Sequence, residues 1–472
     1  MPENSRATAR DSYGEKGPIM TIHTMSPVDH AWFRMDSPEN LMMVHAIMWT
    51  DEPLDWEALR TEMTERMVVR FPKFTQHPIP ARYPLGRARW RHDPDFDVDR
   101  HIVRHRLKPP GDRQALADYV GEQIPQSMDL SHPMWQVHFI DGLGNGSAVL
   151  FRMHHSIADG ITLTRVLLSL TTSDSEHAGF VAPAGGGAVA EMTAAARGVV
   201  SQGLRTIRDP ARVVTAAAAG GRGLQRLVHL ATIPQKPRSA LAGQVGAKKQ
   251  VTWTLPWPLT SIKDISRSAG VTVNDVLLSV LADALSRYLA EEETPLESVR
   301  VMVPVNLRPL DRPLSADLGN AFGEYVVTLP TGDMEPLERL ARMREITEGL
   351  KDSPEAVVAY LTLIAIGLSP GPVEDLSTRL FSGKVVATVS NVPGPRSQVT
   401  LAGTPVIGII GWVPAAGDVG LGVSMFSYDG HVLVGLIADA LLIPDLDRLA
   451  GHFTESLTDL AEGTAMPRPK KR

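Results

Sequence analysis

The feature that most constrains the fold of this chain is a turn at residues 151–160, which reads FRMHHSIADG. The residues before the histidines, SAVLFRM, are apolar enough for a buried strand, whereas GITLTRVLLSLT after them has the apolar spacing of a helix. His154, His155 and Asp159 therefore lie on a predicted strand-to-helix turn. Such turns present polar side chains to substrates while rigid elements hold the turn in place.

The residue types on this turn favour acid–base chemistry. A neutral imidazole is a good general base near pH 7, because its pKa lies close to that pH. Two adjacent histidines cannot point the same way, so we expect only His155 to face a substrate. Asp159 could orient an imidazole, as in a catalytic triad, or fix the turn by binding an arginine, with Arg70 as the candidate. Gly160 beside it allows a tight bend, which favours the structural role, and the chain has no G-x-S-x-G serine motif.

A chain of 472 residues without internal repeats predicts two large domains and a connection. We expect a disordered lead-in at 1–20, a first domain at 21–182, a basic Ala/Gly/Arg-rich linker at 183–246, a second domain at 247–463 and a basic tail at 464–472. Cysteine is absent, which excludes thiolate nucleophiles, disulfides and cysteine-ligated zinc. The net charge of −6 argues against nucleic-acid binding.

Both predicted domains mix strands and helices. In the first, residues 40–50 and 134–143 favour strands, and 55–70 and 113–124 favour helices. In the second, the pattern predicts a helix at 271–289, capped by Thr272 or Asn274, and strands at 300–307, 324–330, 384–392 and 431–439. The apolar run at 356–368 is too short to cross a membrane. It suits a buried core helix or the lining of an apolar pocket.

The predicted linker carries a strong local charge. From Glu191 to Lys249 there are ten Lys and Arg residues against two acids, a local charge of about +8. The arginines of this stretch are Arg197, Arg205, Arg208, Arg212, Arg222, Arg226 and Arg238. A basic amphipathic segment suits an anionic membrane or lipid-body surface, and a solvated linker is the alternative. The N-terminus has no apolar secretion signal, so we expect a cytoplasmic protein bound peripherally to lipid.

The pattern H-H-x-x-x-D-G resembles the signature of the CoA-dependent acyltransferase superfamily. Further stretches resemble, in order, the blocks of bacterial wax ester synthase/diacylglycerol acyltransferases. These stretches read SPVDHAWFRMDSPENLMMVHA, HPMWQVHFIDGL, TVNDVLLSVLADALSRYL, VPVNLRP, GNAFGEYVVTLP and SNVPGP. The resemblance runs from about Ser26 to Phe453. It departs from the family at His30 and Trp32, and at Met134 and Gln136, where leucine and glutamate are usual, which leaves the acceptor preference open.

This resemblance implies two chloramphenicol-acetyltransferase-like α/β domains, with mixed sheets and helices, joined by a helical linker and separated by an active-site tunnel. It implies that His155 takes a proton from an acceptor hydroxyl, which attacks the thioester of a long-chain acyl-CoA. The acceptor would be a diacylglycerol or a fatty alcohol, and the product a triacylglycerol or wax ester. We expect no metal and no cofactor, with acyl-CoA as a substrate. The sequence does not identify the group that stabilises the oxyanion.

Several other residues are candidates for the tunnel or for its support. Asn274 and Asp275 form the family's Asn-Asp pair, as a helix cap or as a substrate contact. The NVPGP turn, with Asn391, Pro393 and Gly394, is expected to shape the tunnel.

Pro133 and Trp135 are expected to pack near the same cavity. Two alternative functions stay open. One is a condensation-type transfer to another alcohol or an amine, and the other is an inactive protein of the lipid-body surface.

Overall fold

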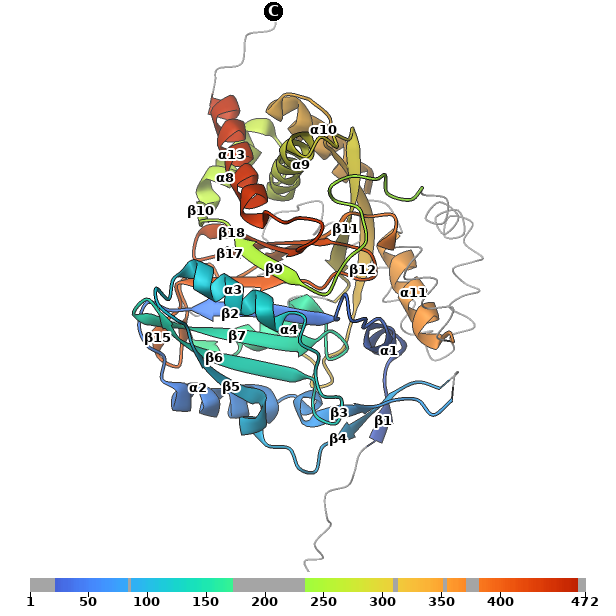
Figure 1. Cartoon of the computed structure of the whole chain (residues 1–472), viewed down its shortest axis with the longest axis vertical. Helices are drawn as coiled ribbons and strands as arrows, with labels where there is room; N and C mark the ends of the chain where they lie inside the picture. Colours follow the sequence, from blue (N-terminus) through green and yellow to red (C-terminus); the bar gives the residue numbers. More distant parts are fainter. Residues whose placement is uncertain are drawn as a thin grey trace, which may run out of the picture.

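The computed structural model describes residues 22–83, 86–172, 234–308, 313–350, 355–370 and 382–465. Two halves, each of strands and helices, stack on one another (Figure 1). The predicted lead-in, most of the basic linker and the basic tail lie outside the described residues.

The N-terminal half is built on a five-stranded sheet with the strand order β16-β2-β7-β6-β5. Its strands from this half are β2 (Met43–Trp49), β5 (Ile102–Arg106), β6 (Trp135–Leu143) and β7 (Gly146–His154). Its helices are α1 (Pro27–Arg34), α2 (Trp56–Met63), α3 (Arg113–Gln123) and α4 (Gly160–Leu168). A smaller sheet of β1 (Ile22–Thr24), β4 (Arg89–His92) and β3 (Gln76–Ile79) lies at its edge, and the two-residue strand β8 (Thr171–Thr172) follows α4.

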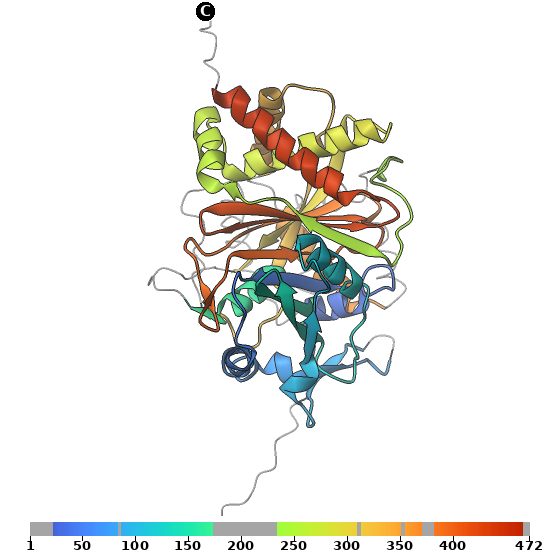
Figure 2. The ribbon, with the colours of Figure 1, turned by 60° about the vertical axis from the view of Figure 1, so that its left-hand side comes forward.

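The C-terminal half is built on a seven-stranded sheet with the order β10-β18-β17-β13-β11-β12 and with β9 paired to β18. These strands are β9 (Lys249–Trp253), β10 (Trp257–Pro258), β11 (Ser298–Asn306), β12 (Phe322–Pro330), β13 (Ala387–Pro393), β17 (Leu421–Tyr428) and β18 (His431–Asp439). The helices α8 (Leu259–Ala269), α9 (Val273–Glu291), α10 (Pro336–Leu350) and α13 (Leu446–Ala465) cover the outer face of this sheet (Figure 2).

Helix α11 (Glu355–Leu368) stands apart from the other C-terminal helices and lies against α1 and β12 (Figure 1). Gly367 makes this packing possible, because a Cβ atom there would collide with the backbone of Pro27. The helix therefore approaches the N-terminal half closely.

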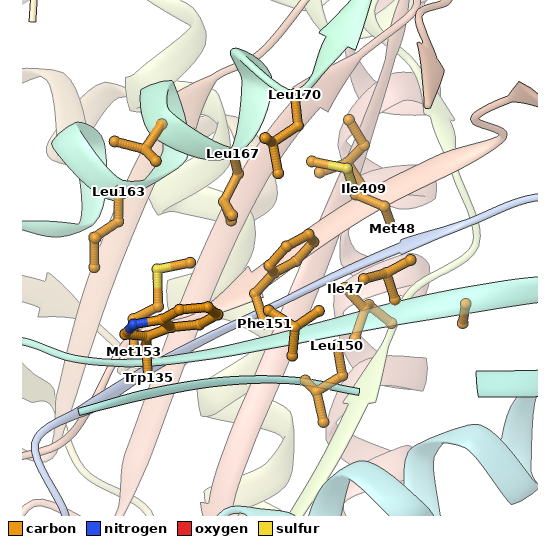
Figure 3. Packing of buried hydrophobic residues seen from close by; sticks show 14 of the residues in the cluster. Ile47, Met48, Trp135, Leu150, Phe151, Met153, Leu163, Leu167, Leu170 and Ile409 are labelled. Atoms are coloured by element: carbon orange, nitrogen blue, oxygen red, sulfur yellow. The ribbon is translucent and has the colours of Figure 1, made fainter. Parts of the chain in front are cut away.

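One strand crosses between the halves. After the short strands β14 (Thr400–Leu401) and β15 (Thr404–Pro405), strand β16 (Gly408–Trp412) pairs antiparallel with β2 and completes the N-terminal sheet. By sequence it belongs to the predicted domain 247–463. In Figure 3, Ile409 of β16 packs beside Met48 of β2, while Leu163 and Leu167 of α4 lie over β7. The two sheets thus share one hydrophobic core near α4.

The predicted mixed α/β architecture is confirmed, and the strands and helices predicted for the two domains form, whereas the predicted helical linker lies outside the described residues. The helix expected at 55–70 ends its α-helical part at Met63 and continues as a π-helical turn, Thr64–Val68. Thr272 caps α9. No single described helix is long and apolar enough to span a membrane, and only α8 with α9, bent by 99°, passes that test as a pair.

Candidate active site

The histidine turn joins the end of β7 to the start of α4. Asp159 is the N-cap of α4, since its Oδ1 accepts a hydrogen bond from the Thr162 N–H at 2.8 Å. The backbone N–H of His155 donates to the Met42 carbonyl at 2.7 Å. The turn is therefore held both by its own helix cap and by the strand β2 region.

His155 lines a cavity between the halves. Its imidazole stacks on the Trp32 indole, with ring centroids 4.3 Å apart, and the Phe322 ring lies 5.5 Å away. Burial lowers the pKa of His155 from 6.5 to about 4, and the nearby charge of Asp159 opposes this shift. The imidazole is therefore neutral near pH 7. Its Nδ1 is buried with no hydrogen-bond partner among the described residues, so Nε2 is the nitrogen available to a substrate.

The cavity around His155 is mainly apolar. Helix α11 contributes Ala359, Thr362, Leu363 and Ile366 to its wall. The run at 356–368 thus lines an apolar pocket, one of its two predicted environments. The remaining wall comes from α1, the histidine turn, the sheet strands and the residues after β16, including Trp32, Met35, Ile161, Met302, Pro304, Phe322, Glu324, Val326, Ser390, Asn391, Val413 and Pro414.

A second apolar cavity meets the first one at Gly160, Ser390 and Val413, which line both. Its wall includes Phe151, Leu163 and Leu167 on one side, with Val392, Ile409, Met425 and Phe426 on the other. It contains no Asp, Glu, Lys or Arg among the residues that line it. Two apolar spaces therefore converge beside the start of α4.

His154 has a different environment from His155. It is fully buried and is held at both ring nitrogens, by Ser156 Oγ at 2.8 Å and by Asp36 Oδ2 at 3.2 Å. It does not line either cavity. Of the two adjacent histidines, only His155 therefore lines a cavity.

The carboxylate of Asp159 binds backbone amides. While Oδ1 caps α4, Oδ2 accepts from the Ala321 N–H at 3.1 Å, in the C-terminal half. The predicted partner Arg70 is exposed, with its guanidinium 5.4 Å from the centre of the neighbouring Phe71 ring. The Arg70 prediction is therefore wrong, because Asp159 fixes the turn through the helix cap and through a backbone amide of the other half, just before β12.

A buried polar cluster under the turn was not predicted from the sequence. Asp29 forms an ion pair with Lys73 at 2.8 Å and accepts from Asn320 Nδ2 at 2.9 Å. Lys73 donates to the Ile157 carbonyl at 3.0 Å, and Asn320 Nδ2 donates to the His155 carbonyl at 2.8 Å. The cluster thus holds the backbone of the turn from three separate parts of the chain. Asp29 and Asn320 lie in stretches that resemble the family's blocks, and this resemblance is the sequence feature that could have indicated their importance.

The Asn-Asp pair divides into two supporting roles. Asp275 forms a capping box with Thr272 and accepts from the Thr347 hydroxyl at 2.6 Å, so it is buried in the helical layer. Asn274 Oδ1 accepts from Asn391 Nδ2 at 3.2 Å. Asn391 lines the cavity, whereas Asn274 and Asp275 do not. Asn274 therefore reaches the site through Asn391.

The other candidates of the NVPGP turn and the Pro-Met-Trp block support the walls without lining either cavity. Gly394 follows Pro393 at the end of β13, and a side chain there would collide with Ser427 and Phe426. Trp135 donates from Nε1 to the Phe74 carbonyl at 2.8 Å and stacks on His101, inside the N-terminal core. Pro133, two residues before it, is also buried.

Within the described parts of the chain, no group of three or more His, Cys, Asp or Glu residues is placed to hold a metal ion.

Lys249, the last basic residue of the stretch 191–249, begins β9 and is buried in an ion pair with Asp439 at 2.8 Å.

Comparison with solved structures identifies the fold. The wax ester synthase/diacylglycerol acyltransferase of Marinobacter aquaeolei VT8 superposes with a TM-score of 0.64 at 21% identity, covering 94% of this chain and all of that one. The first condensation domain of the calcium-dependent antibiotic synthetase gives 0.61 at 16% identity, covering 95% and 97%. The two-domain chloramphenicol-acetyltransferase-like fold predicted from the sequence is confirmed.

Sequence comparisons identify the family. A protein of Mycobacterium tuberculosis described as a probable diacylglycerol O-acyltransferase is 26% identical, over 86% of this chain and 88% of its own length. A second from that organism is 27% identical, over 94% and 99%. The wax ester synthase/diacylglycerol acyltransferase catalytic domain matches residues 25–277, and the C-terminal domain of the same family matches 318–461. The chain belongs to the wax ester synthase/diacylglycerol acyltransferase family.

Proposed function

We propose that this enzyme transfers a long-chain acyl group from acyl-CoA to a lipid hydroxyl, with His155 as the general base. The observation that carries the proposal is the neutral, buried imidazole of His155 in the first apolar cavity, which a second apolar cavity meets at Gly160 and Ser390. One cavity can hold the acyl chain and the other the acceptor lipid. A base in the wall of one cavity, near the point where the other meets it, can act on an acceptor hydroxyl as ester formation requires.

In the proposed reaction, Nε2 of His155 takes the proton of the acceptor hydroxyl as its oxygen attacks the thioester carbonyl. The tetrahedral intermediate then collapses, its carbon–sulfur bond breaks, and the departing CoA thiolate takes the proton from the imidazolium. The products are an ester and free CoA, and His155 is again neutral. The low pKa of His155 favours return of the proton.

The developing oxyanion needs a hydrogen-bond donor. Ser390 is the candidate, because it lines both cavities and its hydroxyl makes no hydrogen bond to any described residue. Asn391 is the next residue, and its amide is already held by Asn274.

Diacylglycerol and fatty alcohols are the proposed acceptor classes, because relatives carry these activities in their names. Condensation-type transfer to an amine is the second candidate, favoured only by the likeness to condensation domains. An inactive lipid-surface protein is the third, and the intact His155 site argues against it. We further propose a cytoplasmic enzyme whose basic segment binds an anionic membrane or lipid-body surface, from the charge of residues 191–249 alone.

The test is incubation of the purified protein with labelled palmitoyl-CoA and hexadecanol, dipalmitoylglycerol or a long-chain amine, with CoA release and labelled products both measured. Ester formation from either alcohol, lost in His155→Ala, supports the proposal. Amide formation alone would support the condensation alternative, and no transfer to any acceptor would support the inactive one. Ser390→Ala, measured alongside, excludes the oxyanion assignment if its kcat equals that of the wild type.

A further inference from the structure

A single glutamate stands in the apolar wall of the His155 cavity. Glu324 lies on β12, opposite Pro304 of β11, and lines the same cavity as His155. Its carboxyl makes no hydrogen bond or ion pair with any residue that the structure describes. The mechanism proposed above gives it no role.

The strand geometry places this carboxyl on the cavity wall, one step along the strand from Phe322, which contacts His155. Side chains alternate along β12, so Phe322, Glu324 and Val326 share the face that lines the cavity. The Phe322 ring lies 5.5 Å from the His155 ring. Glu324 is two residues further along the strand, a step of about 7 Å between Cα atoms. A lipid whose hydroxyl meets His155 must therefore pass Glu324 if it extends along β12.

The surroundings of Glu324 supply no counter-charge. The other titratable groups that line the cavity are His155 and Asp159, and no Lys or Arg lines it. Burial raises the pKa of Glu324 to about 7. An alkyl chain against this carboxyl would remove its water and offer no hydrogen bond in return, which is unfavourable whether the group is charged or neutral.

We propose that Glu324 selects the acceptor: it binds a second hydroxyl next to the reacting one, so that the preferred acceptors are vicinal diols and monoacylglycerols over simple fatty alcohols. This inference rests on the proposed acyl transfer and narrows its acceptor class, because diacylglycerols and fatty alcohols carry a single free hydroxyl and have none left for Glu324. The carboxylate accepts a hydrogen bond from the second hydroxyl while His155 takes the proton of the first. The second cavity, which no Asp, Glu, Lys or Arg lines, takes the acyl chain.

The experiment compares hexadecanol with its vicinal diol, because the two differ by one hydroxyl. For the wild type we expect kcat/KM to favour the diol by about tenfold to a hundredfold, the range for a hydrogen bond to a charged, partly buried group. Glu324→Leu should bring the ratio close to one, chiefly by improving hexadecanol. Glu324→Gln, which keeps the shape and a hydrogen bond, should keep part of the preference.

Thr328→Leu is the matched control. Thr328 is exposed on the same face of β12 but lies outside the cavity, so its replacement should leave the ratio unchanged. A wild-type enzyme that esterifies both alcohols equally, or a Glu324→Leu enzyme with the wild-type ratio, overturns the inference while leaving acyl transfer intact.

Calorimetric binding of the two alcohols to His155→Ala separates the two claims. A diol preference in binding that disappears in the double variant His155→Ala, Glu324→Leu supports the role of Glu324 independently of turnover. Equal binding of both alcohols to His155→Ala overturns it. If the wild type transfers the acyl group to none of the acceptors, the proposed function itself is contradicted.

Discussion

The Trp32 indole stacks on the His155 imidazole, with 4.3 Å between ring centroids and 26° between the planes. Trp32 comes from α1, and the Phe322 ring contacts both rings, with its centroid 5.5 Å from that of the imidazole and 5.6 Å from that of the indole. Two aromatic neighbours fix the plane of the base and keep water from it, which contributes to the desolvation that lowers its pKa.

The first prediction concerns pH. Because the pKa of His155 is about 4, the base stays neutral at mildly acidic pH. The apparent pKa of the acidic limb of the kcat/KM profile should therefore lie well below 6.5, the ordinary value for a histidine. Trp32→Ala admits water and should move this limb upward, towards 6.5. The measurement is kcat/KM for acyl-CoA as a function of pH, in both proteins, with the acceptor held at a saturating concentration. An identical acidic limb in the two proteins would contradict the role of Trp32.

The same shift affects stability. The folded pKa of His155 is depressed, so the unfolded chain takes up a proton first as pH falls from about 6.5 to about 4. As the pH falls through that window, His155 should therefore lower the free energy of unfolding. Above the window its contribution should not depend on pH. Thermal melts of Trp32→Ala against pH should show a shallower loss there.

The second prediction separates the two histidines. His155→Ala should lower kcat by about a hundredfold to ten-thousandfold with the fold retained, because it removes the base and leaves the backbone contacts of the turn in place. His154→Ala should cost about 1–3 kcal/mol of stability, since it leaves Asp36 and Ser156 without their shared partner. The measurements are kcat and the melting temperature of both variants, which together separate a loss of chemistry from a loss of stability. Full activity in His155→Ala together with an inactive, well-folded His154→Ala would reverse the assignment.

The third prediction tests how Asp159 holds the turn. Asparagine caps helices about as well as aspartate, but it has a single carbonyl oxygen and cannot accept from both Thr162 and Ala321. Asp159→Asn should therefore lower both stability, by about 1–3 kcal/mol, and activity. Asp112→Asn is the control, because Asp112 caps α3 through one amide only and is exposed. Unchanged melting of Asp159→Asn with a large loss of turnover would instead make Asp159 an orienter of the base.

Local patterns were sufficient to predict the strand that ends at the histidines and the helix after Asp159. They could not predict the cluster of Asp29, Lys73 and Asn320, because its members meet only when both halves fold together. The Arg70 hypothesis failed for the same reason: the second contact of Asp159 comes from a backbone amide 162 residues away. Strand β16 likewise pairs across the predicted domain boundary, and pairing between distant segments leaves no periodic signal.

The final prediction concerns the basic segment, whose arginines from Arg197 to Arg226 lie outside the described residues. Arg205, Arg208 and Arg212 would share one face of a helix by their spacing, and each cation near an anionic bilayer contributes on the order of 1 kcal/mol before screening by salt. Replacing these three by Gln should weaken co-sedimentation with anionic vesicles and make the remaining binding less sensitive to salt. Turnover of an acceptor dispersed in detergent should not change, because His155 lies outside the segment.

The matched control for this test replaces three exposed arginines elsewhere, Arg104, Arg267 and Arg342, whose side chains are 54%, 77% and 63% exposed. It removes the same charge from the folded surface, so a general effect of net charge would weaken vesicle binding equally in both triple variants. Weaker binding only in the segment variant supports a lipid-binding role, since the local concentration of positive charge is then the cause. Equal binding of the wild type and the segment variant would make the stretch a solvated connection between the two domains.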